Sequence, residues 1–485
     1  MNEMTVLLSL KGAGLSIKRK EKLNDINISI CDGDTLGVYG LNGSGKSLLA
    51  ELLAGNLKND QGSMELTDGV QAAVVSSAER KRMLEEDRYN DDSEFMEGRI
   101  DPGRSVNDIF RIYIDDEDKS DINRYAAMFG ISHILDRGIK FLSTGEFRKM
   151  MIVSSLLSKP DILILDDPYT GLDLATRTGL HRLIGEIKKE VSALVLISGR
   201  LDDLNVCRRL FMLKEGSLKE YASFEHIKSD SREGLQPLPS FTEGQPVQVV
   251  SKPEATELIR MEAVRMSYYE NQILTDINWR VVSQEHWQII GPNGSGKSSL
   301  LSLINGDSPK AYGQDIFLFG RKRGSGETIW DIKQQIGYVS GALQRQHRIS
   351  QNVLSVVVSG FFDSIGLYDR PDPVQIEKAR DWCHEFGMGD LLVKPFDSLS
   401  EGMKRAVLII RAIVKRPQIL ILDEPCQGLD DYNSDFVIKI AERVVARDHS
   451  TLLYVSHDPY YHMDAIDNVL TLISHSGGGY TGEIS

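Results

Sequence analysis

The 485-residue sequence has few cysteines, no long apolar run and no excess of positive charge. Its four cysteines, Cys31, Cys207, Cys383 and Cys426, lack C-x-x-C spacing, which indicates reduced, buried thiols and argues against zinc or iron–sulfur sites. No stretch approaches the roughly 18 uninterrupted apolar residues of a membrane span. The N-terminus lacks the basic and apolar segments of a secretory signal. Any membrane role is therefore expected to come through a partner.

The charge balance is acidic, with a net charge of −14. Such a balance argues against broad electrostatic affinity for nucleic acid or anionic lipid, so we expect no nucleic-acid partner. It favours a cytoplasmic protein. At this length, and with 41% apolar residues, the chain is expected to hold two or more domains, each with a sizeable core.

A glycine-rich loop is present twice, as GLNGSGKS at residues 40–47 and as GPNGSGKS at residues 291–298. A strand-like apolar run precedes each copy, and helix-forming residues follow. Backbone N–H groups of such a loop surround phosphates, its lysine neutralises the β and γ oxygens, and its last serine ligates Mg²⁺. Each copy predicts a nucleoside triphosphate site, whose residues are Gly40, Asn42, Gly43, Ser44, Gly45, Lys46 and Ser47, and Gly291, Asn293, Gly294, Ser295, Gly296, Lys297 and Ser298.

The repeat continues beyond the loops, in the same order along the chain. Apolar runs end in acidic pairs at residues 162–167 and 419–424, 257 residues apart. Further strands are expected at residues 193–198 and 452–456, alternating with helical segments. This alternation predicts an α/β fold in which a mostly parallel sheet is flanked by helices.

The domain boundaries follow from this repeat. We expect a first domain over residues 1–228 and a second over residues 258–485. Residues 229–257 between them are polar and contain several prolines and glycines, which is typical of an extended linker.

Two more motifs complete the pattern of each half. A Leu-Ser-x-Gly segment precedes the acidic pair, at residues 142–145 and 399–402, and Gly-Leu-Asp follows it, at residues 171–173 and 428–430. With these ordered motifs the chain resembles the ATP-binding cassette (ABC) ATPases over nearly its whole length. The resemblance implies two tandem P-loop NTPase cassettes of the ABC type, each with a helical subdomain, and an ATP hydrolase with ATP and Mg²⁺ as cofactors.

The resemblance also implies a head-to-tail sandwich of the two halves. Each ATP would lie between the phosphate loop of one half and the Leu-Ser-x-Gly segment of the other, and the sandwich would be intramolecular because both halves share one chain. This places Ser143, Gly145, Ser400 and Gly402 on ATP. The alternative for the two serines is simple capping of a helix.

The two sites are expected to differ. By resemblance, Glu424 orients or deprotonates the attacking water, His457 contacts the γ-phosphate, and Tyr268 stacks on adenine. Asp167, Gly199 and Ile17 stand at these positions in the first half. The side chain of Asp167 has one methylene fewer than that of Glu424, which moves its carboxylate by about 1.5 Å. A misplacement of about 1 Å can cost on the order of 100-fold in rate. The residues implied at Mg²⁺ are Ser47, Asp166, Ser298 and Asp423.

We therefore expect the first site to bind ATP and to turn it over slowly, with Asp167 as its catalytic carboxylate. The alternatives are that Asp167 is fully competent, that His457 is structural and that Tyr268 packs in the core. Both halves also depart from the family where a Gln normally reaches Mg²⁺, since Ser77 and Gly341 stand there and Gln344 follows three residues after the latter.

Residues 318–340 and the tandem layout resemble bacterial tandem cassette proteins associated with molybdate transport. This implies an ATPase of a molybdate transporter, docked on an integral membrane permease through residues 321–339, at the cytosolic face of the inner membrane. Arg321, Lys322 and Arg323 form either an anion patch or a solvated turn. The alternatives are a soluble ATPase acting on ribosomes or DNA, and a regulatory switch closed by ATP.

Overall fold

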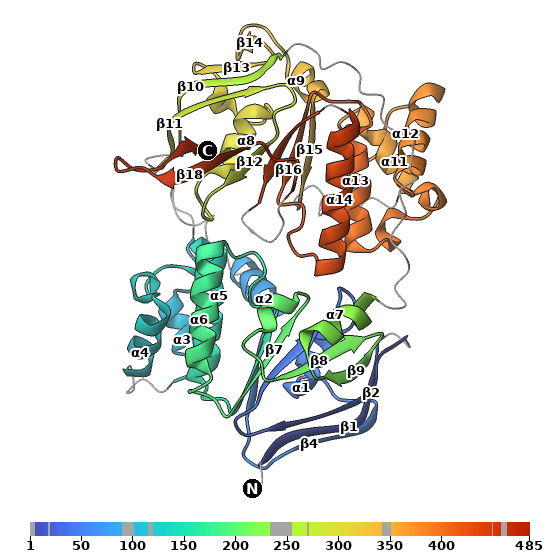
Figure 1. Cartoon of the computed structure of the whole chain (residues 1–485). Helices are drawn as coiled ribbons and strands as arrows, with labels where there is room; N and C mark the ends of the chain where they lie inside the picture. The colour runs from blue at the N-terminus through green and yellow to red at the C-terminus, as the bar shows by residue number, and fades with distance from the viewer. Residues whose placement is uncertain are drawn as a thin grey trace. The chain divides into compact units, whose positions relative to one another are not determined.

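The computed structural model describes residues 5–17, 20–89, 101–114, 120–232, 255–268, 271–341, 351–448, 450–456 and 463–485. The chain divides into two compact units, Met1–Leu235 and Gln236–Ser485, each described by itself (Figure 1). The expected linker, 229–257, overlaps the end of helix α7 and the first residue of strand β10. Its central part lies outside the described residues.

The first unit contains two sheets. In the larger one, with strand order β5-β6-β7-β3-β8-β9, all neighbours run parallel except β8 and β9. The other is antiparallel, with strand order β2-β1-β4. The strands are β1 (Val6–Ile17), β2 (Lys20–Cys31), β3 (Thr35–Tyr39), β4 (Gln61–Leu66), β5 (Ala72–Val75), β6 (Ile162–Asp166), β7 (Ala193–Ser198), β8 (Arg209–Lys214) and β9 (Ser217–Tyr221).

The second unit repeats this plan in one ten-stranded sheet of order β14-β13-β10-β11-β19-β18-β12-β17-β16-β15. Strands β15, β16, β17, β12 and β18 run parallel, and β10, β11, β13 and β14 are paired antiparallel. The strands are β10 (Glu257–Tyr268), β11 (Asn271–Val282), β12 (Trp287–Ile290), β13 (Asp315–Leu318), β14 (Arg321–Lys322), β15 (Ile336–Ser340), β16 (Ile419–Asp423), β17 (Thr451–Val455), β18 (Asn468–Ser474) and β19 (Tyr480–Ile484).

Helices cover the parallel strands. The α-helices are α1 (Lys46–Leu53), α2 (Ser77–Tyr89), α3 (Val106–Phe110), α4 (Ser120–Phe129), α5 (Thr144–Leu157), α6 (Leu174–Ile187), α7 (Phe224–Arg232), α8 (Lys297–Ile304), α9 (Ile329–Gln335), α11 (Val353–Val358), α12 (Pro373–Glu385), α13 (Glu401–Ile413) and α14 (Asp431–Asp448). The 3-10 segments are η2 (Ser132–Ile134), η3 (Ile139–Phe141), η4 (Leu201–Leu204), η5 (Pro309–Ala311), η6 (Ser359–Phe361), η7 (Gly389–Leu391) and η8 (Phe396–Ser398). No helix in the described ranges is long and apolar enough to cross a bilayer.

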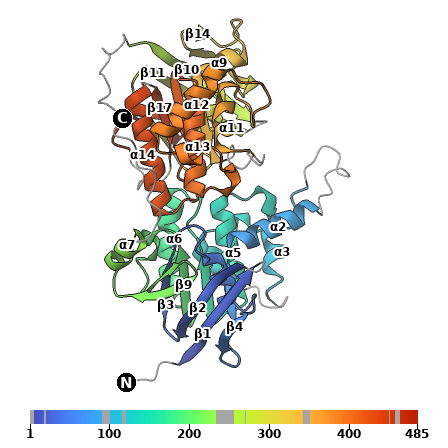
Figure 2. The ribbon, with the colours of Figure 1, turned by 90° about the vertical axis from the view of Figure 1, so that its right-hand side faces the viewer.

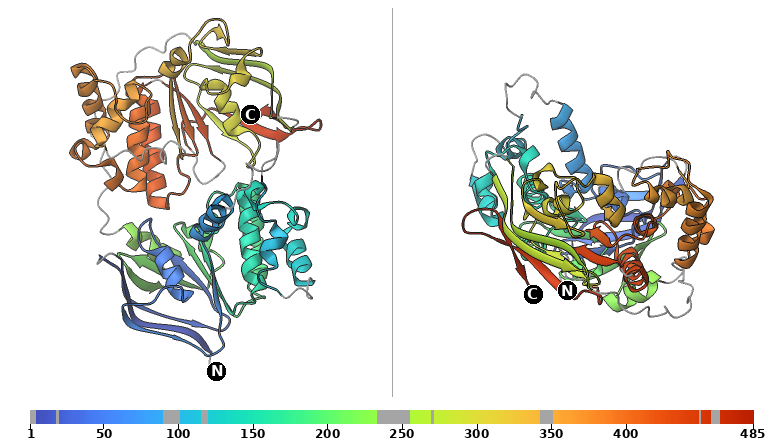
Figure 3. Two further views of the ribbon diagram at one scale, coloured as in Figure 1. Left: turned by 180° about the vertical axis from the view of Figure 1, so that it is seen from behind. Right: turned by 90° about the horizontal axis from the view of Figure 1, so that it is seen from above.

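Two cores cover opposite faces of each parallel sheet. On β6, Ile162 and Ile164 pack with α1 and the antiparallel strands, whereas Leu163 and Leu165 pack with α5 and α6. Side chains along a strand alternate between faces, so a continuous apolar run is what a sheet covered on both sides needs. Figure 3 shows α1 lying over the sheet of the first unit. The apolar run of β16 divides in the same way.

Each unit also has a group of helices beside its sheet. In the second unit, α11 and α12 pack against α13, and α13 packs against α14 (Figure 2). In the first unit, α3 and α4 pack against α5. These groups match the expected helical subdomains, and the predicted α/β class with two mostly parallel, helix-flanked sheets is confirmed.

The antiparallel strands were not predicted. Strands β1 and β2 are twelve residues long, but bulges shift their register, and Asp25 adopts a positive φ of 49°. The equivalent Asp276 of β11 has the same φ. Each bulge changes the face to which the following side chains point, so a simple apolar–polar alternation is lost.

His286 connects the start of β12, the strand that leads into the second phosphate loop, to the neighbouring β17 and to the residue before β18. It precedes β12, and its Nδ1 accepts a hydrogen bond from the backbone N–H of Leu452 in β17, at 3.1 Å. The backbone N–H of His286 donates to Oδ2 of Asp467, the residue before β18, at 2.8 Å. Burial lowers the pKa of His286, with the charge of Asp467 acting in the opposite direction. The bond from Leu452 requires an unprotonated Nδ1.

Acidification should therefore destabilise the second unit through His286. Because its folded pKa is lowered, the unfolded chain takes up the proton first, below about pH 6.5. The contribution of unprotonated His286 to the free energy of unfolding is fully present above that pH, and it is lost as the pH falls towards the pKa of His286 in the folded protein. Between pH 7.5 and pH 5.5, the melting temperature of the wild type should fall further than that of His286→Gln. The exposed His384 supplies the control, and a slope for His286→Gln as steep as that of His384→Gln would contradict the assignment.

Candidate active site

Each glycine-rich loop connects a sheet strand to a helix, β3 to α1 and β12 to α8. The helices begin at Lys46 and Lys297, directly after a glycine in the left-handed region. Left-handed backbone is rare for residues with a Cβ, and it allows the chain to turn its N–H groups around an anion. The left-handed loop residues are Gly43, Gly45, Gly294 and Gly296.

A serine hydroxyl points into each loop. A Cβ on Gly40 would lie 2.6 Å from Ser44 Oγ, and one on Gly291 would lie 2.7 Å from Ser295 Oγ. Both hydroxyl oxygens are buried without a hydrogen-bond partner. A buried, unsatisfied hydroxyl is costly in a folded protein. These loops therefore fit phosphate oxygens as ligands.

The loop lysines are held in the same way in both units. Lys46 Nζ donates to the carbonyl oxygens of Gly40 at 2.7 Å and Leu41 at 3.3 Å. Lys297 Nζ donates to those of Gly291 at 2.7 Å and Pro292 at 3.0 Å. Both side chains are buried, so each loop presents a desolvated positive charge.

The acidic pairs stand at the carboxyl ends of β6 and β16. Ser47 Oγ donates to Asp166 Oδ2 at 2.6 Å, and Asp166 Oδ1 is buried without a hydrogen-bond partner. Burial, and then the charge of Asp167, raises the pKa of Asp166 to about 6. A serine hydroxyl beside an unsatisfied carboxylate oxygen fits Mg²⁺, which takes oxygen ligands and completes its shell with phosphate and water.

The second unit offers the same residue types. Ser298 is exposed at the start of α8, and Asp423 is half-buried at the end of β16. Burial raises the pKa of Asp423, and the charge of Glu424 acts in the same direction. These residues also fit Mg²⁺. Across the described residues, no group of three or more His, Cys, Asp or Glu side chains is placed to hold a metal ion.

The second member of each acidic pair has an unusual backbone. Asp167 and Glu424 adopt positive φ values of 46° and 51°. The N–H of Asp167 donates to Ile197 O in β7, and that of Glu424 donates to Val455 O in β17, both at 2.9 Å. A non-glycine residue in this region costs of order 1–3 kcal/mol and is commonly found at functional sites. Both units therefore hold the backbone of this residue in the same conformation at the edge of the sheet.

The units differ in what lies beside this carboxylate. Ile197 of β7 and Val455 of β17 pair with the first acidic residue in the same register, so Gly199, two residues after Ile197, is the sequence counterpart of His457. In the first unit, the N–H of Gly199 donates to Asp167 Oδ1 at 3.1 Å. His457 and Gln344 lie outside the described residues, so their predicted roles stay predictions.

Tyr268 stands at the end of β10 and is 45% exposed. The alternative that it packs in the core is therefore wrong. Lys310 Nζ lies 4.9 Å from the centre of its ring. Ile17 is exposed at the end of β1, at the corresponding place in the first unit. Only the second unit offers an accessible aromatic face here, as base stacking would require.

Ser143 and Ser400 are the N-caps of α5 and α13. Each Oγ accepts a hydrogen bond at 3.2 Å from the backbone N–H three residues later, at Glu146 and Met403 respectively. The capping alternative is therefore realised, and contact with a phosphate stays a prediction. Glu146 also accepts from Ser143 N–H at 2.8 Å and from Arg137 at 3.0 Å, which offsets its negative charge.

We call the two Leu-Ser-x-Gly segments, 142–145 and 399–402, the signature segments. Their glycines, Gly145 and Gly402, pack against the helix that follows Gly-Leu-Asp. A Cβ on Gly145 would lie 2.8 Å from Thr176 Cγ2, and one on Gly402 would lie 2.1 Å from Asn433 Oδ1. Asp430 accepts hydrogen bonds from the N–H and the side-chain amide of Asn433 at 2.8 Å. The glycines are therefore required for close packing inside each unit, whatever they contact on a nucleotide.

Sequence reasoning missed two buried arginines, Arg148 and Arg405, each five residues after a signature serine. Arg148 Nη2 donates to Ser77 Oγ at 3.4 Å and interacts electrostatically with the Asp166–Asp167 pair. Arg405 Nη1 donates to Glu424 O at 3.5 Å. Each arginine connects the signature helix to the acidic pair of its own unit. Their identical position after the two serines was the available signal.

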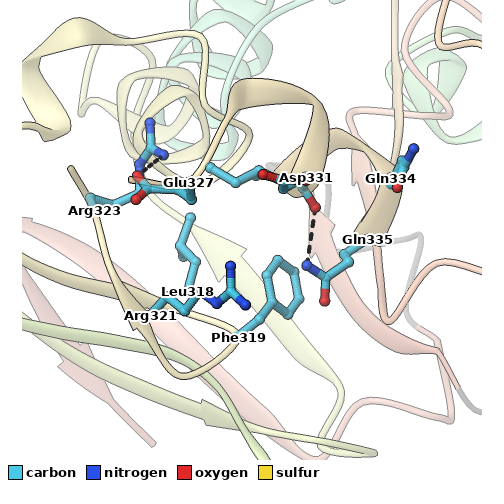
Figure 4. Close-up of a pocket in the computed structure, with 9 residues that line it drawn as sticks. Leu318, Phe319, Arg321, Arg323, Glu327, Asp331, Gln334 and Gln335 are labelled. Atoms are coloured by element: carbon cyan, nitrogen blue, oxygen red, sulfur yellow. Dashed lines mark hydrogen bonds and ion pairs between the residues drawn. The ribbon is translucent and has the colours of Figure 1, made fainter. Parts of the chain in front are cut away.

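The run Arg321–Arg323 forms neither a uniform anion patch nor a simple solvated turn. Arg321 and Lys322 are exposed, whereas Arg323 is buried and forms a 2.6 Å ion pair with Glu327. Lys322 pairs with Asp315 at 2.6 Å. Arg321 lines a pocket of about 350 Å³ at the β13–β14 hairpin and α9 (Figure 4), lined also by Leu318, Phe319, Arg323, Glu327, Asp331, Ile332, Gln334 and Gln335.

Comparisons with known proteins identify the family of the chain. The family model described as ABC transporter matches residues 23–170 and 274–427. The chain is 38% identical to the ABC transporter ATP-binding protein ModF of Escherichia coli, over 88% of each chain. It is 33% identical to an uncharacterised ABC transporter ATP-binding protein of Schizosaccharomyces pombe, over 64% of this chain and 63% of that protein.

Solved structures of tandem cassettes have the same fold. An archaeal ribosome recycling factor, aABCE1, solved with the ribosomal stalk protein aP1, aligns with a TM-score of 0.64 at 16% identity, over 97% of this chain and 89% of that chain. That likeness concerns the fold alone. The two family matches coincide with the two phosphate loops and acidic pairs, so the chain belongs to the ABC transporter family and is a tandem ABC ATPase that hydrolyses ATP.

Proposed function

We propose that the second unit carries out most of the ATP hydrolysis and that the first unit holds ATP for longer. The observation that carries this proposal is the bond from Gly199 N–H to Asp167 Oδ1. It ties the shorter carboxylate to the backbone at the place where the second unit has His457. The attacking water of the first site then lacks both a long carboxylate and an imidazole.

In the second unit, we assign proton transfer to the residues at the edge of the sheet. Glu424 accepts the proton of the water that attacks the γ-phosphorus, and His457 donates a hydrogen bond to a γ-phosphate oxygen. Lys297 neutralises charge on the β and γ oxygens, and Tyr268 stacks on the adenine. Ser298 and Asp423 would hold Mg²⁺, which would neutralise charge at the phosphates.

We further propose that the two halves close head to tail on ATP. Ser143 would then lie at the nucleotide of Lys297, and Ser400 at that of Lys46. Both serines sit at the N-terminal ends of helices of thirteen or fourteen residues, where the helix dipole and free N–H groups favour an anion. Contact with the γ-phosphate would make closure depend on ATP.

The transport link is the finer part of the proposal. The similarity to an ABC transporter ATP-binding protein supports an ATPase that works with a membrane permease. The resemblance of residues 318–340 to tandem cassettes associated with molybdate transport suggests molybdate as the cargo. Docking would use the surface at residues 321–339, which includes the pocket of Figure 4. Ser77 and Gly341, in place of the family's Gln, indicate that coupling to a partner differs from that of ordinary transporters.

The asymmetry predicts unequal effects of two matched substitutions. Glu424→Gln removes the proton acceptor of the active site, so turnover should fall by about 100-fold or more. Asp167→Asn should change turnover only modestly, because the first site contributes little. Steady-state phosphate release at saturating MgATP measures both. Equal losses from the two variants would refute the asymmetry.

Closure predicts a disulfide between halves that depends on ATP. In a variant without the four native cysteines and with Glu424→Gln, Thr144→Cys and Asn293→Cys should crosslink when MgATP is added under mild oxidation. The control pairs Thr144→Cys with Asn42→Cys, which belong to one half and should stay apart. Crosslinking of the control alone would exclude the head-to-tail arrangement.

The partner is tested by purification of Glu424→Gln with MgATP, followed by mass spectrometry. A transport-linked ATPase should retain an integral membrane protein, and adding Arg321→Glu should reduce its recovery. In the otherwise wild-type protein, Arg321→Glu should leave ATP turnover unchanged. The exposed Lys228, on a helix of the first unit, supplies the matched control Lys228→Glu. Retention of ribosomal particles or DNA instead would support the soluble alternative and exclude the permease link.

A further inference from the structure

Tyr338 forms a hydrogen bond at the second acidic pair that none of the recurring motifs accounts for. Its hydroxyl donates to Asp423 Oδ2 at 3.1 Å. Tyr338 lies on β15 opposite Ile421 of the neighbouring parallel strand β16, and Asp423 follows two residues later. Side chains two residues apart on a strand share a face, so the ring extends along the sheet towards the carboxylate.

The first unit has no such hydroxyl at this place. Its β5 pairs with β6 in the same register, with Val74 opposite Ile164, so Val74 is the counterpart of Tyr338. There, Asp166 accepts instead from Ser47, which is itself a predicted Mg²⁺ ligand. In the second unit a hydroxyl outside the phosphate loop holds the carboxylate.

The Tyr338 hydroxyl is itself held in place. The side chain of Ser340, two residues along the same strand, forms a second hydrogen bond with it. Its ring is half-buried and packs against the apolar core on the α8 face of the sheet. The side chain is thus held by hydrogen bonds at its hydroxyl and by apolar packing along its ring.

We propose that Tyr338 is a positioning residue for Mg²⁺ at the second site. By holding Oδ2, it fixes the Asp423 carboxylate in one orientation and leaves Oδ1 to face the metal or its water. Outer-shell partners of this kind typically change metal affinity or activity by 10–100-fold. The inference rests on the proposed role of Asp423 at Mg²⁺, and it adds a reason why the two units differ.

Tyr338→Phe tests this with almost no change of volume. The background carries Lys46→Ala, so that a fluorescent ATP analogue reports the second site. Tyr338→Phe should raise the Mg²⁺ concentration for half-maximal tightening of nucleotide binding by about tenfold. Affinity measured in EDTA should be unchanged, because the hydroxyl acts through Asp423. If Tyr338 acted only on stability, its substitution would change both the Mg²⁺ titration and the affinity in EDTA, or neither of them.

The control is Tyr368→Phe, which removes the hydroxyl of a tyrosine that is 73% exposed. Ser340→Ala is the second variant, and it should shift the Mg²⁺ titration in the same direction by a smaller factor. A titration of Tyr338→Phe that coincides with that of Tyr368→Phe would overturn the proposal. This binding assay does not depend on which half hydrolyses ATP, so it can succeed even if Glu424→Gln and Asp167→Asn reduce turnover equally.

Discussion

One backbone hydrogen bond in each unit fixes the conformation of the second acidic residue, on which the proposed chemistry of the site depends. The N–H of the second acidic residue, Asp167 or Glu424, donates to the end of the neighbouring strand and holds that residue in the left-handed region. This conformation occurs directly after the last residue of β6 or β16, at the carboxyl edge of the sheet. The phosphate loop, the first carboxylate and the residue after the neighbouring strand all reach the same edge, because parallel strands end there together.

The same scaffold supports two different chemical environments. In the first unit, Asp166 Oδ2 accepts a hydrogen bond from Ser47 and Asp167 Oδ1 accepts one from Gly199, both from within the site itself. In the second unit, Asp423 is held by Tyr338 from a strand beside it. A carboxylate that is held from outside leaves the loop serine available for other ligands. The proposed catalytic asymmetry would then depend on a few side chains placed on similar strands and loops.

The buried arginines add a connection within each unit. Arg148 and Arg405 lie on the helices that begin at the signature serines, and they contact Ser77 and the backbone of Glu424 respectively. A buried guanidinium is stable only near compensating oxygen atoms. The position of each signature helix is therefore coupled to the acidic pair of the same unit, which gives a physical route between the capping serine and the nucleotide edge.

Sequence reasoning succeeded where a local pattern carried the physics. The loops of glycine and lysine, the apolar runs ending in carboxylates and the constant spacing of the repeat predicted the parallel sheets, the helices and the residues that meet at their edge. It failed for the antiparallel strands, because bulges at positions such as Asp25 interrupt the alternation of side chains.

The sequence by itself thus determined the family, the duplication and the difference between Asp167 and Glu424. Only the tertiary structure decided that Tyr338 and the buried arginines belong to the sites, that Arg323 is buried in an ion pair while Arg321 is exposed, and that Tyr268 is accessible. The hydrogen bonds of Arg405 and Tyr338 join residues 19 and 85 positions apart, so a local sequence pattern does not reveal them. The burial of Arg323 and the exposure of Arg321 and Tyr268 are set by how strands and helices pack.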